Sequence, residues 1–161
     1  MTRFNTNVSL KDDVRDSIVN QLNVVLATSV DLTSQIKQAH WNIKGPEFFA
    51  RHELFDKLAD RTRAVVDDVA ERAATLGGYA EGTVRMAAEK SVLEPYDDKA
   101  VQGRRHVELL ANRFGAYSAL LRSSIAQLEG KDVVTEDLYT EALRQAELDM
   151  WFLESHLNGQ R

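Results

Sequence analysis

The feature that most constrains this chain is a long helical stripe between two glycine-containing breaks. A Gly-Pro pair at residues 45–46 and a Gly-Gly pair at residues 77–78 bound a segment without further glycine or proline. Within it, core-type side chains recur at intervals of three and four residues: Phe55, Leu58, Thr62, Val66, Val69, Ala73 and Leu76. Because this spacing places them on one side of a helix, we expect one amphipathic helix from about Pro46 to Leu76.

Three other segments carry the same helical spacing. The first stripe precedes the Gly-Pro pair and reaches His40 four residues after its last member: Val14, Ile18, Leu22, Val25, Leu32 and Ile36. The third ends at Gly130 and contains Val107, Leu110, Phe114, Tyr117, Leu121, Ile125 and Leu128. The fourth stops before Gly159 and contains Leu138, Ala142, Ala146, Met150, Leu153 and Leu157.

Polar residues mark the expected starts of these helices. Ser9 followed by Asp12 predicts an N-cap for the first helix. Asp97 or Asp98 is the expected N-cap of the third helix, and Thr135 is that of the fourth. Residues 77–96 form a long connection with a possible short helix over residues 84–90, which fits a crossover that carries the chain along the bundle. The pattern therefore predicts an all-α, ferritin-like four-helix bundle over residues 9–158, with short tails at residues 1–8 and 159–161.

Composition narrows the chemistry. The chain has 161 residues, enough for one domain with its own core, and it contains no cysteine, so any metal must be held by His, Asp and Glu. A net charge of -5 argues against a nucleic-acid-binding surface over the whole molecule. No apolar run approaches the roughly 18 residues of a membrane span, and the N-terminus resembles no signal peptide, so we expect a cytoplasmic protein without membrane contact.

Metal-ligand side chains form a second stripe on the second helix. His52 and Asp56 are four residues apart, as are Asp67 and Glu71, so each pair lies on one helical face. The pairs are separated by about 16 Å, which is too far for one metal site. On a helical wheel the stripe is centred roughly 130° from the core stripe. We therefore expect these side chains to point toward a neighbouring molecule.

The usual intrachain di-iron site of four-helix bundles needs Glu-x-x-His pairs, and no histidine here has glutamate three residues before it. Two copies of the second helix packed antiparallel about a two-fold axis instead place each His52/Asp56 pair beside the other copy's Asp67/Glu71 pair. His40 can complete the first half. Two imidazoles and three carboxylates suit Fe(II) and tolerate Zn(II) or Mn(II), whereas the lack of sulfur ligands disfavours Cu(I).

Three stretches resemble the Dps family, the mini-ferritins called DNA-binding proteins from starved cells. They are KQAHWNIKGPEFFARHELFD, DDVAERAATLGG and LDMWFLESHL, and the resemblance covers nearly the whole chain. It implies a ferroxidase centre between two-fold-related subunits, with His40, His52 and Asp56 from one chain and Asp67 and Glu71 from the other. It also implies a hollow homododecamer that oxidises Fe(II), preferentially with hydrogen peroxide, and stores a ferric mineral.

The resemblance suggests further roles, each with an ordinary alternative. Trp41 resembles the family tryptophan beside the centre, and Glu53 is either a cavity-facing mineral nucleus or a surface residue. The acidic group consists of Glu129, Asp132, Glu136 and Asp137; it lines a three-fold pore for iron or simply complements a helix N-terminus. We assign His106 and His156 to structural or surface positions, Asp68 to solvent and Trp151 to packing.

DNA binding is the competing function, as a nucleoid-compacting protein with little ferroxidase role. Family members that bind DNA often use lysine-rich tails, which act by neutralising phosphates. Here the tails offer only Arg3 ahead of Lys11, and only Arg161 after Leu157. We therefore expect weak or absent DNA binding at physiological salt.

Overall fold

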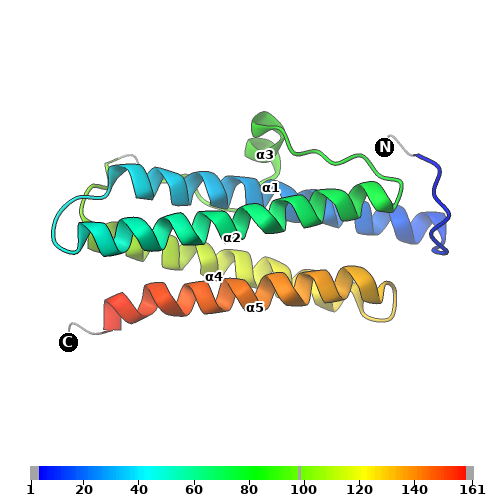
Figure 1. Ribbon diagram of the computed structural model, residues 1–161. Helices are drawn as coiled ribbons and strands as arrows, with labels where there is room; N and C mark the ends of the chain where they lie inside the picture. Colours follow the sequence, from blue (N-terminus) through cyan, green and yellow to red (C-terminus); the bar gives the residue numbers. More distant parts are fainter. Residues whose placement is uncertain (1–3, 98, 159–161) are drawn as a thin grey trace.

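Four long helices and one short helix make up the described part of the chain (Figure 1). The computed structural model describes residues 4–97 and 99–158, so Asp98 and the residues at each end lie outside the description. The elements are α1 (Asp12–Asn42), α2 (Phe48–Thr75), α3 (Val84–Lys90), α4 (Gly103–Leu128) and α5 (Val133–Asn158). This confirms the predicted all-α, ferritin-like bundle.

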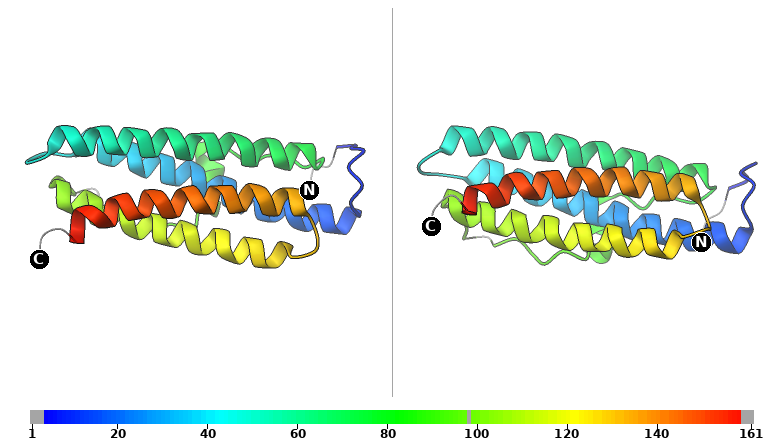
Figure 2. Two further views of the ribbon diagram at one scale, coloured as in Figure 1. Left: turned by 60° about the horizontal axis from the view of Figure 1, so that its bottom comes forward. Right: turned by 90° about the horizontal axis from the view of Figure 1, so that it is seen from below.

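Two antiparallel helix pairs form the bundle. α1 packs most extensively on α2 and α4 on α5, and the pairs meet through the α1/α4 and α2/α5 contacts (Figure 2). The crossover runs along the outside of the bundle and carries α3, which packs on α1. It brings the start of α4 to the α1–α2 turn, where the Lys44 amide donates to the Val101 carbonyl at 3.0 Å. The predicted role of the crossover is thus confirmed.

The core follows the predicted stripes on α1, α2 and α4 but departs from the one on α5, where Tyr139 and Leu143 are buried and Leu138, Met150 and Leu157 are half-buried. All seven stripe residues of α2 are buried except Val66, which is half-buried, and α4 likewise leaves only Ile125 half-buried. Tyr117, Tyr139, Phe55 and Phe114 are the largest side chains in this core. On α2 the metal-ligand stripe lies outside this core, with His52 and Asp56 half-buried and Asp67 and Glu71 exposed.

The predicted helix starts were mostly wrong. α1 begins after Lys11, which makes no side-chain cap, and Asp12 and Asp13 in its first turn complement the positive end of the helix dipole. Asp97 does not cap α4; its carboxylate accepts the Lys99 amide at 3.0 Å and so closes a local turn. α5 begins at Val133, two residues before the predicted cap Thr135, so Asp132 takes the cap position.

A glycine pair ends α2 and admits close packing there. Gly77 has φ +79°, and the amides of Gly77 and Gly78 donate to the Ala74 and Ala73 carbonyls, which closes a Schellman motif. A Cβ on Gly78 would lie 2.3 Å from a Val19 methyl, so only glycine lets α1 approach this turn.

The segment before α1 lies against this same turn rather than standing free. The Phe4 amide donates to the Gly77 carbonyl at 2.8 Å, and the Thr6 hydroxyl donates to the Thr75 carbonyl at 3.1 Å. Among the described residues, no helix is long and apolar enough to cross a bilayer.

Candidate metal centre

The turn between α1 and α2 brings His40 and His52 face to face. His40 lies in the last turn of α1 and His52 in the first turns of α2. Their rings stack with centroids 3.6 Å apart and an interplanar angle of 22°. The Phe48 ring packs on His52 at 5.1 Å, on the side of the preceding turn. Two imidazoles distant in sequence are therefore held as one unit.

Reciprocal hydrogen bonds set the tautomer of both imidazoles. His40 Nδ1 lies 2.9 Å from the His52 carbonyl oxygen, and His52 Nδ1 lies 2.9 Å from the His40 carbonyl oxygen. A carbonyl oxygen only accepts, so each Nδ1 must carry the proton and donate it. In the neutral ring this leaves the lone pair on Nε2, the arrangement that orients a histidine for a metal ion.

Asp56 joins these histidines one turn further along α2. Its Oδ1 accepts a hydrogen bond from Lys37 Nζ at 2.6 Å and lies 3.9 Å from His40 Nδ1. The Lys37 hydrogen bond is the main reason that the pKa of Asp56 lies below its usual value. The carboxylate is thus ionised, and an ammonium group provides the positive charge that a metal ion would otherwise bring.

Asp67 and Glu71 lie further along α2 and stay apart from this group. Both side chains are exposed, and the helix runs unbroken between the two pairs, so the separation of about 16 Å holds. Within the described residues of one chain, no three His, Asp or Glu side chains converge on a possible metal position. The structure thus stacks His40 on His52 and places Asp56 near His40, without converging all three on one metal position, while Asp67 and Glu71 form a separate pair.

Two residues near the histidines were missed by the sequence reasoning. Lys37 precedes His40 by three residues, so helical spacing alone places them on one face and offered a usable signal. Phe48 precedes His52 by four residues in α2, so the same helical spacing offered a signal for it as well. Trp41 is 65% exposed, and Lys37 Nζ lies 5.9 Å from the centroid of its ring.

The acidic group near the start of α5 divides in the structure. Asp132 is buried and pairs with Arg72 of α2 at 2.7 Å, so its carboxylate is committed within the chain. Glu129 and Asp137 are exposed and Glu136 is half-buried. Glu136 lies in the first turn of α5, where its charge complements the positive end of the helix dipole, and Asp132 caps this helix.

The remaining singled-out residues take ordinary positions. His106 is fully buried, and its Nδ1 lies 2.6 Å from the Tyr96 hydroxyl, which fits the predicted structural role. Glu53 and Asp68 are exposed. Trp151 was expected to serve packing, but it is 59% exposed in the single chain and contributes little to the core.

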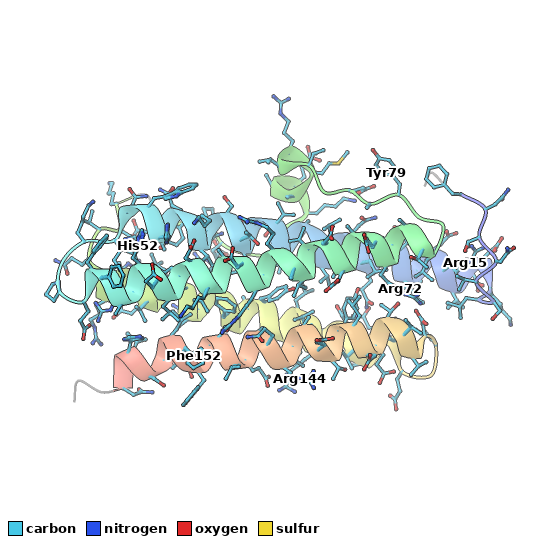
Figure 3. The ribbon with its side chains drawn as sticks, viewed as in Figure 1. Arg15, His52, Arg72, Tyr79, Arg144 and Phe152 are labelled. Carbon is cyan, nitrogen blue, oxygen red and sulfur yellow. The ribbon has the colours of Figure 1, made fainter. Side chains whose placement is uncertain are left out.

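A groove of about 610 Å³ runs between α2 and α5. Glu71 and Asp68 line it from α2, and Asp137 and Glu141 line it from α5. Figure 3 shows that Arg72, also on its wall, lies near the opposite end of α2 from His52. Arg61 and Arg144 also line this groove, so the Asp67/Glu71 end of the stripe borders a hollow of mixed charge, and the histidine end does not.

Comparison with known proteins gives consistent matches over the whole chain. Residues 19–161 match the ferritin-like domain family. A DNA protection during starvation protein of Agrobacterium fabrum is 34% identical over 158 residues, covering 98% of each chain. The protein of the same name from Mycolicibacterium smegmatis is 32% identical over 159 residues, covering 99% of this chain and 86% of that one.

Solved structures agree with these sequence matches. The tetragonal form of Mycobacterium smegmatis Dps has a TM-score of 0.92 at 32% identity, covering 98% of this chain and 94% of that one. DpsC from Streptomyces coelicolor has the same TM-score and identity, covering 97% of this chain and 92% of that one.

Proposed function

Because this chain belongs to the Dps family of ferritin-like proteins, we propose that it is a mini-ferritin that oxidises Fe(II) and stores the ferric product. The observation that carries the proposal is the clamped pair of His40 and His52 beside Asp56. Their mutual hydrogen bonds fix both rings and leave a lone pair on each Nε2. The rings therefore need no further ordering when a metal ion binds.

The site is completed between two chains in this proposal. Two copies of α2 packed antiparallel about a two-fold axis place His52 and Asp56 of one subunit beside Asp67 and Glu71 of the partner subunit. Each dimer then holds two equivalent centres, each with two imidazoles and three carboxylates. The exposed positions of Asp67 and Glu71, and their distance from the histidines within one chain, support this arrangement.

The donor set fits the chemistry of iron as a substrate. Neutral imidazoles bind Fe(II), and carboxylates stabilise the charge that develops as Fe(III) forms. Two Fe(II) ions supply the two electrons that reduce one hydrogen peroxide, with two protons, to two water molecules. Lys37 donates to Oδ1 of Asp56, so its ammonium charge opposes the binding of an iron cation to the same carboxylate, although Oδ2 offers a second acceptor. Zn(II), which favours the same donors, is expected to compete.

Assembly and storage complete the proposal. The twelve subunits of a hollow dodecamer would enclose the mineral, with Glu53 as a candidate nucleation residue and Trp41 as a sink for stray oxidants. The proposed place of action is the cytoplasm, where reducing conditions keep iron available as Fe(II).

The activity test compares the protein with two variants. Anaerobic loading with Fe(II), followed by hydrogen peroxide, is expected to give Fe(III) far faster than in buffer. His52→Ala combined with Asp56→Ala should abolish that acceleration. Asp68→Ala removes an exposed carboxylate next to Asp67 and should leave the rate unchanged. Equal rates for the protein and the double variant would refute the proposal, and a parallel run with oxygen measures the preference for peroxide.

Mixing two inactive variants tests whether the centre is shared. One carries His52→Ala with Asp56→Ala, and the other carries Asp67→Ala with Glu71→Ala. Co-assembled at equal amounts, half of the dimers are mixed, and each mixed dimer has one centre with all its ligands intact. About one quarter of the activity should therefore return. No recovery after confirmed co-assembly would contradict the shared site.

The alternative function, DNA compaction, is favoured only by the names of the relatives. The segment before α1 has few positive charges, and its described residues lie against the end of α2. We propose that this chain binds DNA weakly or not at all. A mobility-shift assay at about 150 mM salt, where counterion release is already weakened, should show no stable complex.

A further inference from the structure

A closed hydrogen-bond network joins the last turn of α2 to the start of α5. Arg72 Nε donates to Thr135 Oγ1 at 2.9 Å, and Arg72 Nη2 donates to Asp132 Oδ2 at 2.7 Å. The Thr135 hydroxyl in turn donates to the same Asp132 oxygen. Arg72 extends from near the end of α2 (Figure 3), and its two partners flank the first residues of α5.

The network is buried and its ionised groups are well satisfied. The side chains of Arg72 and Asp132 are 12% and 6% exposed, and Thr135 is fully buried. Burial raises the pKa of Asp132, but hydrogen bonds from Thr135, Arg72 and the Val134 amide outweigh it and bring the pKa below its usual value. A buried, fully bonded ion pair of this kind holds its two elements in one relative position.

Its position along α2 gives the network a second consequence. Glu71 directly precedes Arg72, and α2 ends at Thr75, so Glu71 lies only one turn from the end of the helix. Terminal turns fray more easily than the interior of a helix, and the backbone contacts at Gly77 and Gly78 that close this turn do not fix it against α5. The Arg72 contacts hold the turn that carries Glu71 against α5, on the wall of the α2/α5 groove that Glu71 also lines.

We propose that Arg72 is a positioning residue for the metal centre, which keeps Glu71 in place through its contacts with Asp132 and Thr135. This inference rests on the proposed function, because it assigns Glu71 a ligand role. It also explains why an acidic residue at the start of α5 is turned inward, rather than facing solvent like Asp137.

A second ion pair across the same two helices provides a control, in which the carboxylate is buried and the Arg61 side chain is 38% exposed. Arg61 Nη1 pairs with the buried Asp149 at 2.5 Å, and Gln145 Nε2 also donates to Asp149, at 2.9 Å. Arg61 lies in the middle of α2, where helical hydrogen bonds continue on both sides. Loss of this pair should lower stability without moving Glu71.

The experiment measures Co(II) affinity of the assembled protein, because Co(II) binds similar donors, resists oxidation and reports its coordination by visible absorption. Arg72→Met is expected to weaken binding about tenfold, a typical cost of losing a residue that orients a ligand. Arg61→Met should keep the affinity, although both variants unfold at lower temperature. Arg72→Lys restores the charge opposite Asp132 and should recover part of the loss.

Four outcomes separate the possibilities. Unchanged Co(II) affinity and spectrum in Arg72→Met would overturn the inference. A loss of Co(II) affinity in Arg61→Met equal to that in Arg72→Met would also overturn it. If Arg72→Met does not assemble, Thr135→Val decides, because it removes both hydrogen bonds of the Thr135 hydroxyl but keeps the Arg72–Asp132 ion pair; unchanged binding there overturns the inference as well. No binding by the unmodified protein would instead refute the proposed function.

Discussion

Two buried tyrosines in the same core should respond in opposite ways to loss of the hydroxyl group. Tyr139 is fully buried, and its hydroxyl has no hydrogen-bond partner among the described residues. Tyr117 is equally enclosed, but its hydroxyl lies 2.7 Å from Ser29 Oγ. The Ser29 hydroxyl donates to the Val25 carbonyl at 2.8 Å, so Tyr117 must be the donor in the tyrosine–serine bond.

The expected magnitudes follow from this difference. Burying a hydroxyl costs about 1–3 kcal/mol of desolvation, and an unpaired hydroxyl gains no hydrogen bond that offsets this cost. Tyr139→Phe should therefore stabilise the fold by about 1.5 kcal/mol. Tyr117→Phe leaves Ser29 without its donor and should destabilise the fold by about 1 kcal/mol. In both variants the ring remains, so neither change opens a large cavity.

Thermal unfolding followed by circular dichroism measures the effect. For a chain of this size, about 1.5 kcal/mol corresponds to an increase in Tm of about 3–6 °C. Protein concentration must be identical in all samples, because assembly makes Tm depend on concentration. If Tyr139→Phe lowered Tm as much as Tyr117→Phe, the Tyr139 hydroxyl would have a partner and the reasoning would be wrong.

Three further predictions concern the metal centre, the pH dependence and the end of α2. Lys37→Leu removes the ammonium from Asp56 and should tighten anaerobic Fe(II) binding several-fold in calorimetry; weaker binding would show that Lys37 assists the metal. Burial raises the pKa of Tyr117 to about 12 from 10.0, so the unfolded chain loses this proton first and stability falls as pH rises from 10 to 12. Urea unfolding across that range should show a shallower loss for the Tyr117→Phe variant, and an identical slope would contradict the assignment. Gly78→Ala places a methyl group against Val19 and should lower the free energy of unfolding by about 2 kcal/mol in the same assay. An unchanged free energy would mean that α1 shifts away from the methyl group at little cost.

Local spacing was enough to predict the helices and the inward faces of α1, α2 and α4, whereas on α5 the stripe missed the buried Tyr139 and Leu143. The α2 stripe from Phe55 to Leu76 is buried as expected, and α3 covers the residues proposed for a short helix. Helix starts were less predictable, because several polar residues near each boundary can cap equally well. Asp97 and Thr135 were chosen by residue type, but Asp97 closes its own turn and Thr135 binds inward to Asp132.

For the candidate centre, the sequence by itself determined which donors are present and that they divide into two pairs. It did so because helical rise and periodicity depend only on residue number. Tertiary structure alone decided that His40 and His52 stack and bond to each other's carbonyl groups, since that geometry depends on the α1–α2 turn. It also decided that Lys37 holds Asp56 and that Arg72 holds Asp132, because long side chains reach partners that no fixed spacing in sequence can specify.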